Sequence, residues 1–490
     1  MNDLDQLLGR ESLQRLPDAR VPAVRRPAVT RQHRILKGAA HTACIAANFL
    51  LAIGLPFLRA SPVPAADESQ DNAAPPITEE SFAIHGQTTY VVQATDGFHA
   101  PYGGPNSLSP ASNEETVDAT LFLGARLWRG AEIWIQPEID QGFGLDNTLG
   151  VAGFPSGEAY KVGAYHPYFR WPRAFVRQTI DEGGGRESVE GVANQLGGYR
   201  SADRWVITVG KFGVTDIFDT NQYAHDPRSD FLNWSVVDGG AFDYAADAWG
   251  YTVGAAAERY IGSWTMRAGV FDLSNIPNSI HLDPGMHEFQ IDAEIEKRYE
   301  LFGQTGRVLL TGFDSRGRMA LLDETIRLAQ TGINMGTALI DARQYRSRLG
   351  GVLGLEQPIT EAVGVFARVS KAAGNVEPYE FTDIDRSVVI GTSVRGLLWH
   401  RPEDTVGMAV IDNGISAERE EYLNLGGLGI LVGDGKLPHP GPEQILETYY
   451  NLGVLARAHL SLDYQWVKNL GYNTDRGPVS IFAVRFHAQF

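Results

Sequence analysis

The stretch from Lys211 to Trp234 is rich in carboxylate, amide, guanidinium and aromatic side chains. Amide, carboxylate and guanidinium groups pair with sugar hydroxyls, and the flat face of an indole covers the C–H face of a pyranose ring. The alternative is a self-contained loop whose polar groups bond to each other, and the residues alone leave both interpretations open. The candidate side chains are Lys211, Asp216, Asp219, Asn221, Tyr223, His225, Asp226, Arg228, Asp230, Asn233 and Trp234.

Motifs of the common catalytic classes are missing from the sequence. It contains no GxSxG, HExxH, Walker-type or Rossmann glycine pattern. Acidic residues are plentiful, but they are spread over many segments, and no pair stands out as a candidate for general acid–base catalysis. His400 and His439 have no partner at metal-ligand spacing. We therefore expect a protein that is not an enzyme and that holds no metal or cofactor.

The segments that would position these residues alternate with a period of two. In 479–490, Phe482, Val484 and Phe490 occupy even positions, whereas Arg485 and His487 lie at odd ones. One face of such a strand is apolar and the other turns polar. This pattern is typical of a transmembrane β-barrel, in which one face meets lipid and the other a wet lumen.

Similar segments recur from Phe82 onward, for example at 117–128, 290–296 and 363–370. With less regular candidates between them, we expect about 16 strands. The links alternate between short and long, as periplasmic turns and extracellular loops do in bacterial barrels. The sequence therefore predicts an all-β transmembrane antiparallel barrel. The link 181–203 is an exception, because it is too long for a turn.

Two of the long links show helical features. Apolar residues in 319–330 have helical spacing, and 415–425 is a candidate for a short helix. Either segment could cap the barrel mouth or fold inward and narrow the pore.

If the apolar faces meet lipid, the opposite faces line the lumen. An Arg or Lys that faces lipid at mid-depth costs about 2–4 kcal/mol, so the confinement of charge to one face is informative. The sequence predicts a wet lumen with charges of both signs, which sorts solutes by size and hydrogen bonding as well as charge. The inward-facing set is Arg126, Arg267, Arg368, Arg395, Arg485, Asp118, Glu132, Glu138, Asp292, Glu294, Glu296 and Asp463, with Glu447 on a strand that alternates poorly.

Composition agrees with an exported envelope protein. The formal charge of −17 argues against a nucleic-acid partner, and a mean hydropathy of −0.18 argues against a bundle of membrane helices. The apolar segment 38–58 follows basic residues and precedes a small-residue site ending at Ala65, as in a secretory signal peptide. An uncleaved membrane anchor is the alternative.

These boundaries predict three parts of the chain. Residues 1–65 form an N-terminal extension and signal peptide, 66–81 a flexible lead-in, and 82–490 the barrel. The single cysteine, Cys44, lies inside the signal segment, so the mature chain would have no thiol.

Three runs resemble the carbohydrate-selective outer-membrane porins of the OprB type. They are GKFGVTDIFDTNQYAHDPRSDFLNWS (210–235), GDGKLPHPGPEQILETYY (433–450) and DRGPVSIFAVRFHAQF (475–490). The resemblance covers about 82–490. It implies a monomeric barrel of about 16 strands in the outer membrane of a Gram-negative bacterium, which lets sugars such as glucose cross passively. It also implies that Phe490 helps the barrel-assembly machinery to recognise the last strand.

The same resemblance suggests individual channel residues. Glu443 and Glu447 fall on the second run. Family channels narrow to an eyelet of arginine and acidic residues, so inward-facing Arg126 and Glu138 are further candidates. The long N-terminal extension departs from the family pattern. The residues that fall on the first run are Lys211, Asp219, Asn221, Asp226, Arg228, Asn233 and Trp234.

Two rival functions follow from the same pattern. The first is a general diffusion porin with a mild cation preference at low salt, expected from the acidic balance and weakened as salt screens the charges. The second is a barrel enzyme or a polysaccharide exporter.

Overall fold

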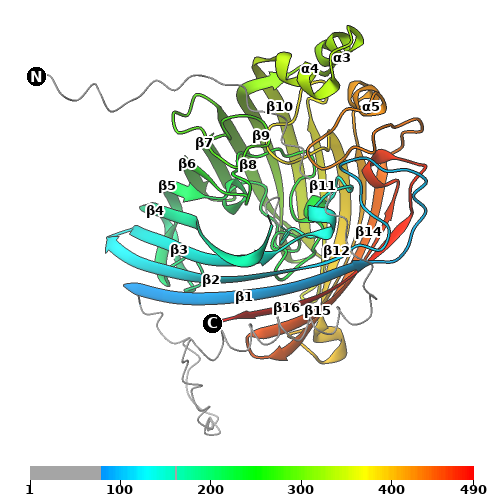
Figure 1. Ribbon diagram of the computed structural model, residues 1–490. Coiled ribbons are helices and arrows are strands. Elements are labelled where there is room, and N and C mark those ends of the chain that lie inside the picture. The colour runs from blue at the N-terminus through cyan, green and yellow to red at the C-terminus, as the bar shows by residue number, and fades with distance from the viewer. Residues whose placement is uncertain (1–78, 160–162) are drawn as a thin grey trace, which may run out of the picture. The chain divides into compact units, whose positions relative to one another are not determined.

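Sixteen antiparallel strands close into one barrel, because β1 pairs with β2 on one side and with β16 on the other (Figure 1). The computed structural model describes residues 79–159 and 163–490. The predicted signal segment, the cleavage site after Ala65 and most of the 66–81 lead-in lie outside these residues. The strands are β1 (Phe82–Thr95), β2 (Asn113–Trp128), β3 (Ala131–Gly142), β4 (Ala164–Val189), β5 (Gly198–Phe212), β6 (Thr252–Ile261), β7 (Trp264–Asp272), β8 (Phe289–Leu301), β9 (Gln304–Ala320), β10 (Arg343–Pro358), β11 (Val363–Ala372), β12 (Arg386–Arg395), β13 (Thr405–Gly414), β14 (Glu443–Leu455), β15 (Ala458–Lys468) and β16 (Val479–Gln489).

The alternation in sequence becomes an inner and an outer face of the barrel. On β16, Phe482 is 53% exposed on the outside, whereas Ile481 and Arg485 are 0% and 1% exposed on the inside. Because side chains of a strand point alternately to opposite faces, the register of each pair fixes which residues reach the lumen. The prediction of an antiparallel barrel with about 16 strands is confirmed.

Short turns lie at one end of the barrel and long loops at the other. The turns 129–130 and 456–457 are examples of the first kind, and the loop 213–251 is the longest of the second. The link predicted at 181–203 is much shorter in the structure. Strand β4 continues to Val189 and strand β5 begins at Gly198, so the turn between them is only 190–197. These are the short-turn end and the long-loop end of the barrel.

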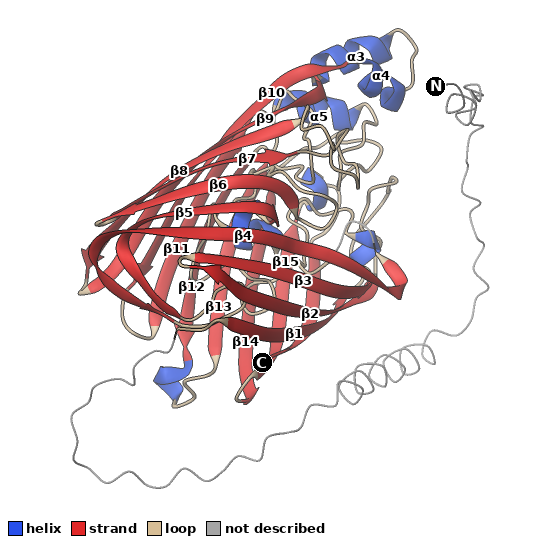
Figure 2. Ribbon diagram, turned by 90° about the vertical axis from the view of Figure 1, so that its left-hand side faces the viewer, coloured by secondary structure: helices blue, strands red, loops and turns tan. Residues whose placement is uncertain are grey.

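Helices are few and lie in the links (Figure 2). The predicted helices at 319–330 and 415–425 are confirmed as α3 and α5, and Figure 2 shows both at the long-loop end. No helix among the described residues is long and apolar enough to span a membrane. The helices are α2 (Trp234–Val237), α3 (Leu322–Gln330), α4 (Met335–Asp341) and α5 (Ala417–Asn424), and the 3-10 turns are η1 (Leu145–Asn147), η2 (Val214–Asp216), η3 (Gly396–Trp399) and η4 (Leu470–Tyr472).

The loop 213–251, here called the inner loop, packs into the barrel. Its Phe218, Phe231 and Phe242 are fully buried. Phe231 meets Tyr449 of β14 edge-on at 4.9 Å between ring centroids, and Phe242 packs 5.2 Å from Phe313 of β9. Burying large aromatic side chains is strongly favourable, and these contacts reach strands on different sides of the barrel. The inner loop therefore fills much of the lumen.

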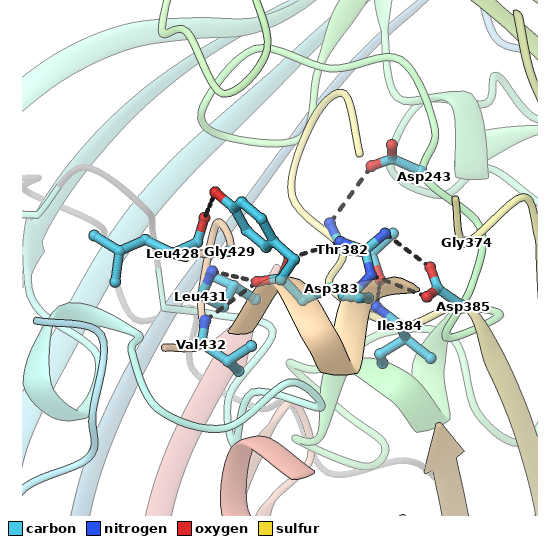
Figure 3. Close-up of polar contacts among 12 residues, drawn as sticks. Asp243, Gly374, Thr382, Asp383, Ile384, Asp385, Leu428, Gly429, Leu431 and Val432 are labelled. Atoms are coloured by element: carbon cyan, nitrogen blue, oxygen red, sulfur yellow. Dashed lines mark hydrogen bonds and ion pairs between the residues drawn. The ribbon is translucent and has the colours of Figure 1, made fainter. Parts of the chain in front are cut away.

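Two further loops are tied to the inner loop by buried carboxylates (Figure 3). Asp243 of the inner loop accepts hydrogen bonds from backbone N–H groups of the β11–β12 loop, including that of Thr382 at 3.4 Å. Asp383 of that loop in turn accepts from Leu431 at 2.6 Å and Val432 at 3.1 Å in the β13–β14 loop. Because a buried carboxylate must be satisfied, these contacts fix the relative positions of three loops.

Candidate functional site

A cavity of about 320 Å³ lies between the inner loop and the inner face of β4. We call it the central cavity. Charged groups of both signs reach it, notably Arg170, Arg173, Asp226, Arg228 and Asp238. Its size is at the lower end of small-molecule sites, and it mixes apolar walls with a few polar groups, as such sites do. The aromatic residues that line it are Phe122, Phe154, Trp234, Tyr244, Trp249, Tyr251 and Phe381.

A β-bulge brings two arginines of β4 to the cavity. Arg170 and Arg173 are three residues apart, so regular alternation would send them to opposite faces. The β3–β4 register shifts between them, because Glu138 pairs with Arg170 and Gln136 with Arg173. The extra residue in the bulge re-aims one side chain. Both guanidinium groups then point inward, and Arg170 lies 5.3 Å and Arg173 4.8 Å from the ring centre of Tyr251.

Arg228 of the inner loop is held by carboxylates from three segments. Its Nε lies 3.3 Å from Glu158 and 3.8 Å from Asp118, and its Nη2 lies 3.9 Å from Glu138. Although burial opposes the charged form, these carboxylates hold the pKa of Arg228 well above its ordinary value. The guanidinium is therefore a fixed cation that lines the cavity and is paired with these three carboxylates.

The indole of Trp234 forms an apolar wall of the same cavity. It stacks on Phe154 with ring centroids 5.2 Å apart and planes 13° apart, and Phe381 meets it edge-on at 5.3 Å. Asp238 follows at the end of α2 and accepts a hydrogen bond from Tyr244 at 2.9 Å. Burial raises the pKa of Asp238 to about 7, and the charge of Asp219 adds to the effect.

A second cavity of about 790 Å³, here called the vestibule, lies at the short-turn end. It is bounded by the β2–β3 turn and by the β4–β5 turn. Asn194, Asp216 and His225 line both cavities. Arg177 of β4 donates hydrogen bonds to Glu132 at 3.0 Å and to the carbonyl oxygen of Asn194 at 2.7 Å, which holds the β4–β5 turn against the wall. The two cavities therefore adjoin at this turn.

Comparison with known proteins identifies the family. The model of the carbohydrate-selective porin family OprB matches residues 111–490. The chain belongs to the OprB family. A comparison with curated proteins found no match.

A solved structure shares the fold. The high-pH structure of Pseudomonas putida OprB superposes with a TM-score of 0.63 at 14% identity, covering 84% of this chain and 94% of that one. The outer-membrane channel DcaP of Acinetobacter baumannii is 10% identical with a TM-score of 0.46, covering 84% of this chain and 97% of that one. This OprB-family protein is thus a passive, carbohydrate-selective channel of the bacterial outer membrane rather than an enzyme. The resemblance of the three sequence runs is confirmed.

Several of the sequence-predicted residues line the cavities of this OprB-family channel, and two of them, Asp216 and His225, line both. Asp226, Arg228 and Trp234 line the central cavity. Arg126 lines the vestibule and donates hydrogen bonds to the carbonyl oxygens of Glu80 at 2.9 Å and Gly197 at 3.4 Å.

The inner loop is held by predicted residues that lie outside both cavity linings. Glu447 of β14 accepts from the N–H groups of Leu232 and Asn233, the first at 2.6 Å. Asn233 donates to Gln465 at 3.0 Å, and Asn221 caps the N–H of Tyr223 at 2.9 Å. These residues fix the path of the loop.

Glu138 and Lys211 also support other groups. Glu138 is buried behind Arg170, to which its carboxylate is paired at 2.5 Å. Lys211 pairs with Asp247 at 2.7 Å near the end of the inner loop. Asp247 in turn accepts from the N–H of Trp249 at 2.9 Å, so the ion pair anchors an aromatic wall of the central cavity.

Sequence reasoning missed Arg170, Arg173 and most of the aromatic wall. The arginines are hidden by the bulge, although the intervening Pro172 is a recognised signal for one. Tyr251 and Phe381 come from separate links, and no period in the sequence connects them. Among the described residues, no group of three His, Cys, Asp or Glu side chains could hold a metal ion.

Proposed function

We propose that mono- and oligosaccharides, glucose among them, pass through the central cavity and then the vestibule. The observation that supports this best is that Trp234, Asp226 and Arg228 line one cavity. An indole covers the C–H face of a pyranose, while a carboxylate and a guanidinium accept from and donate to its hydroxyls.

Passage by this route needs no energy source. A sugar that enters a narrow cavity loses water, and the polar groups of the wall replace those hydrogen bonds. Binding must be favourable enough for entry and weak enough for release, which several weak contacts achieve better than one strong site. The channel would then favour sugars over equally small solutes that lack the matching hydroxyls.

We also propose that the short turns face the periplasm, that the channel works as a monomer, and that Phe490 marks the last strand for the barrel-assembly machinery. Phe490 exchanges backbone hydrogen bonds with Gly86 at 2.9 and 3.2 Å, at the seam where β16 meets β1. Because Phe490 follows the strand that closes the barrel, it lies where the assembly machinery could bind that strand before the barrel closes.

Flux of labelled glucose into proteoliposomes tests the proposal. We expect uptake to saturate with concentration and to be inhibited by unlabelled maltose, but not by proline, a small solute without sugar hydroxyls. Protein-free liposomes give the background. Uptake that rises linearly and ignores maltose would favour a general diffusion porin. No uptake above background would favour the exporter class.

A further inference from the structure

The vestibule is rich in arginine. The arginines that line it are Arg126, Arg129, Arg177, Arg186, Arg200 and Arg204. Arg200 and Arg204 lie at even positions of β5, and the same side of this strand carries buried Thr208. The arginines therefore come from several strands and converge on one space.

Carboxylates do not balance these arginines one for one. Arg200 and Arg204 share a single carboxylate, Glu187, at 3.5 and 3.3 Å, and Arg204 also donates to the carbonyl oxygens of Ser201 and Ala202. Arg186 stacks over Tyr199 at 3.9 Å from the ring centre, and Arg126 donates to backbone carbonyl oxygens. No carboxylate pairs with either of these two among the described residues.

Most of the lining carboxylates are already committed. Glu132 pairs with Arg177 at 3.0 Å, and Glu258 with Arg267 at 3.2 Å. Asp216 accepts from Arg173 at 2.7 Å, and Asp181 lies 3.9 Å from Arg129. Glu79 is the lining carboxylate that has no ion pair among the described residues. The vestibule therefore keeps a small excess of positive charge.

Polar atoms in the vestibule wall also lack partners. The side chain of Arg204 is 5% exposed, and its Nε is buried without a hydrogen bond among the described residues. Thr208 Oγ1 is likewise buried without a hydrogen bond, and Arg200 Nε has only the 3.5 Å ion pair with Glu187. Buried donors in folded proteins are nearly always paired, so this row of unpaired groups is a preformed place for an acceptor.

We infer that the vestibule is a binding site for sugars that carry one carboxylate, with uronic acids as the class. The guanidinium groups of Arg200 and Arg204 would take the carboxylate, and the side-chain oxygen of Asn194, buried and unpaired, would accept from a sugar hydroxyl. The small excess of charge fits a monoanion better than a dianionic phosphate. This inference rests on the proposed sugar path and adds a substrate class to it.

The test compares glucuronate with glucose as blockers of single-channel current in a planar bilayer. Each is added to one side at a time, because the vestibule lies at the short-turn end of the channel. From one side, we expect glucuronate to block at a concentration about tenfold lower than glucose does, since charge-assisted hydrogen bonds are stronger than neutral ones. Acetate and inorganic phosphate should block poorly, because they lack the ring.

Substitutions of vestibule residues test whether glucuronate blocks the channel at this site. Arg204→Gln and Arg200→Gln should each weaken the glucuronate block about tenfold and leave the glucose block within about twofold. Lys297→Gln removes the same charge from β8, where Lys297 lies over Trp264 on the outer face, and should change neither. Glu187→Gln removes the shared carboxylate and should tighten the glucuronate block. If Arg204→Gln does not fold, the half-exposed Arg200 and Glu187 carry the test.

Equal block by glucose and glucuronate from both sides would overturn the inference while leaving the sugar path intact. So would arginine variants that behave like wild type, or acetate that blocks as well as glucuronate. If neither sugar blocks the wild-type channel, the proposed function fails and the inference fails with it.

Discussion

The guanidinium of Arg368 on β11 lies 3.1 Å from the carboxylate of Asp219 in the inner loop, and both side chains are almost fully buried. The same guanidinium donates to the carbonyl oxygens of Asp219, Ala224 and Val236. One barrel side chain therefore binds the inner loop at four points. A residue predicted to line a wet lumen instead fixes the loop that narrows it.

Replacing Arg368 should destabilise the protein and widen its channel. Arg368→Met leaves the Asp219 carboxylate buried without a cation, which typically costs about 3–5 kcal/mol in free energy of unfolding. The thermal transition in detergent should fall, and the single-channel conductance should rise as the inner loop loosens. Arg395→Met, at an exposed position at the end of neighbouring β12, is the matched control and should change neither. A conductance equal to that of wild type would show that the loop is held by other contacts.

Trp234 should contribute to sugar contact. Trp234→Ala removes the apolar wall that stacks on Phe154, and we expect maltose to block the channel current about fivefold less tightly, which corresponds to about 1 kcal/mol for one aromatic contact. Trp171→Ala removes an indole that is 51% exposed on β4 and should leave the block unchanged. An equal effect of both substitutions would point to a general loss of structure.

Sugar binding should depend on pH near neutrality through Asp238. Burial and the charge of Asp219 raise its pKa to about 7, while Arg368 opposes them, and Tyr244 and Asp216 also face it. Above this pKa the ionised carboxylate is the stronger hydrogen-bond acceptor, so sugar block should tighten roughly fivefold from about pH 5.5 to about pH 8.5. Asp238→Asn should abolish the change. A block that does not vary with pH in wild type would contradict this account.

The same pKa has a consequence for stability, with a definite sign. Because the folded-state pKa of Asp238 lies above that of the unfolded chain, the folded state holds its proton more tightly. This group therefore stabilises the fold most at low pH, and that stability is lost as pH rises from about 4 to about 7. Thermal unfolding of Asp238→Asn should show a weaker dependence on pH in this window than wild type does.

Phe490 should matter for assembly more than for conduction. Phe490→Ala keeps the backbone hydrogen bonds to Gly86 but removes the aromatic ring. We expect a several-fold lower yield in the outer membrane of cells, whereas protein refolded in detergent should conduct like wild type. A wild-type amount of Phe490→Ala in the outer membrane would show that the assembly machinery does not need this ring.

Period-two alternation was sufficient to predict the barrel and the face of most strands. It failed at 181–203, where three consecutive glycines, Gly183 to Gly185, adopt positive φ and the β4–β5 register shifts. This hairpin is largely exposed, so neither of its faces has to be uniformly apolar. Because no face of this hairpin has to be apolar, its sequence does not alternate, and alternation cannot reveal its strands.

The site was less predictable than the fold. Period-two alternation placed Arg368, Arg485 and Glu447 on the inner face of the barrel, but it could not show that the inner loop covers them. Arg485 donates to the carbonyl oxygens of Pro227 and Asp230, a contact between residues more than 250 positions apart. Such partners depend on the path of a long loop through the barrel, which no local pattern specifies.

Single-channel current through the refolded protein, with glucose, maltose and trehalose titrated in turn, tests the central claim most directly. A sugar held in the central cavity excludes ions, so the account predicts a current that falls with sugar concentration and saturates. Steady current steps that no sugar reduces would contradict a sugar-binding channel and leave a general diffusion porin.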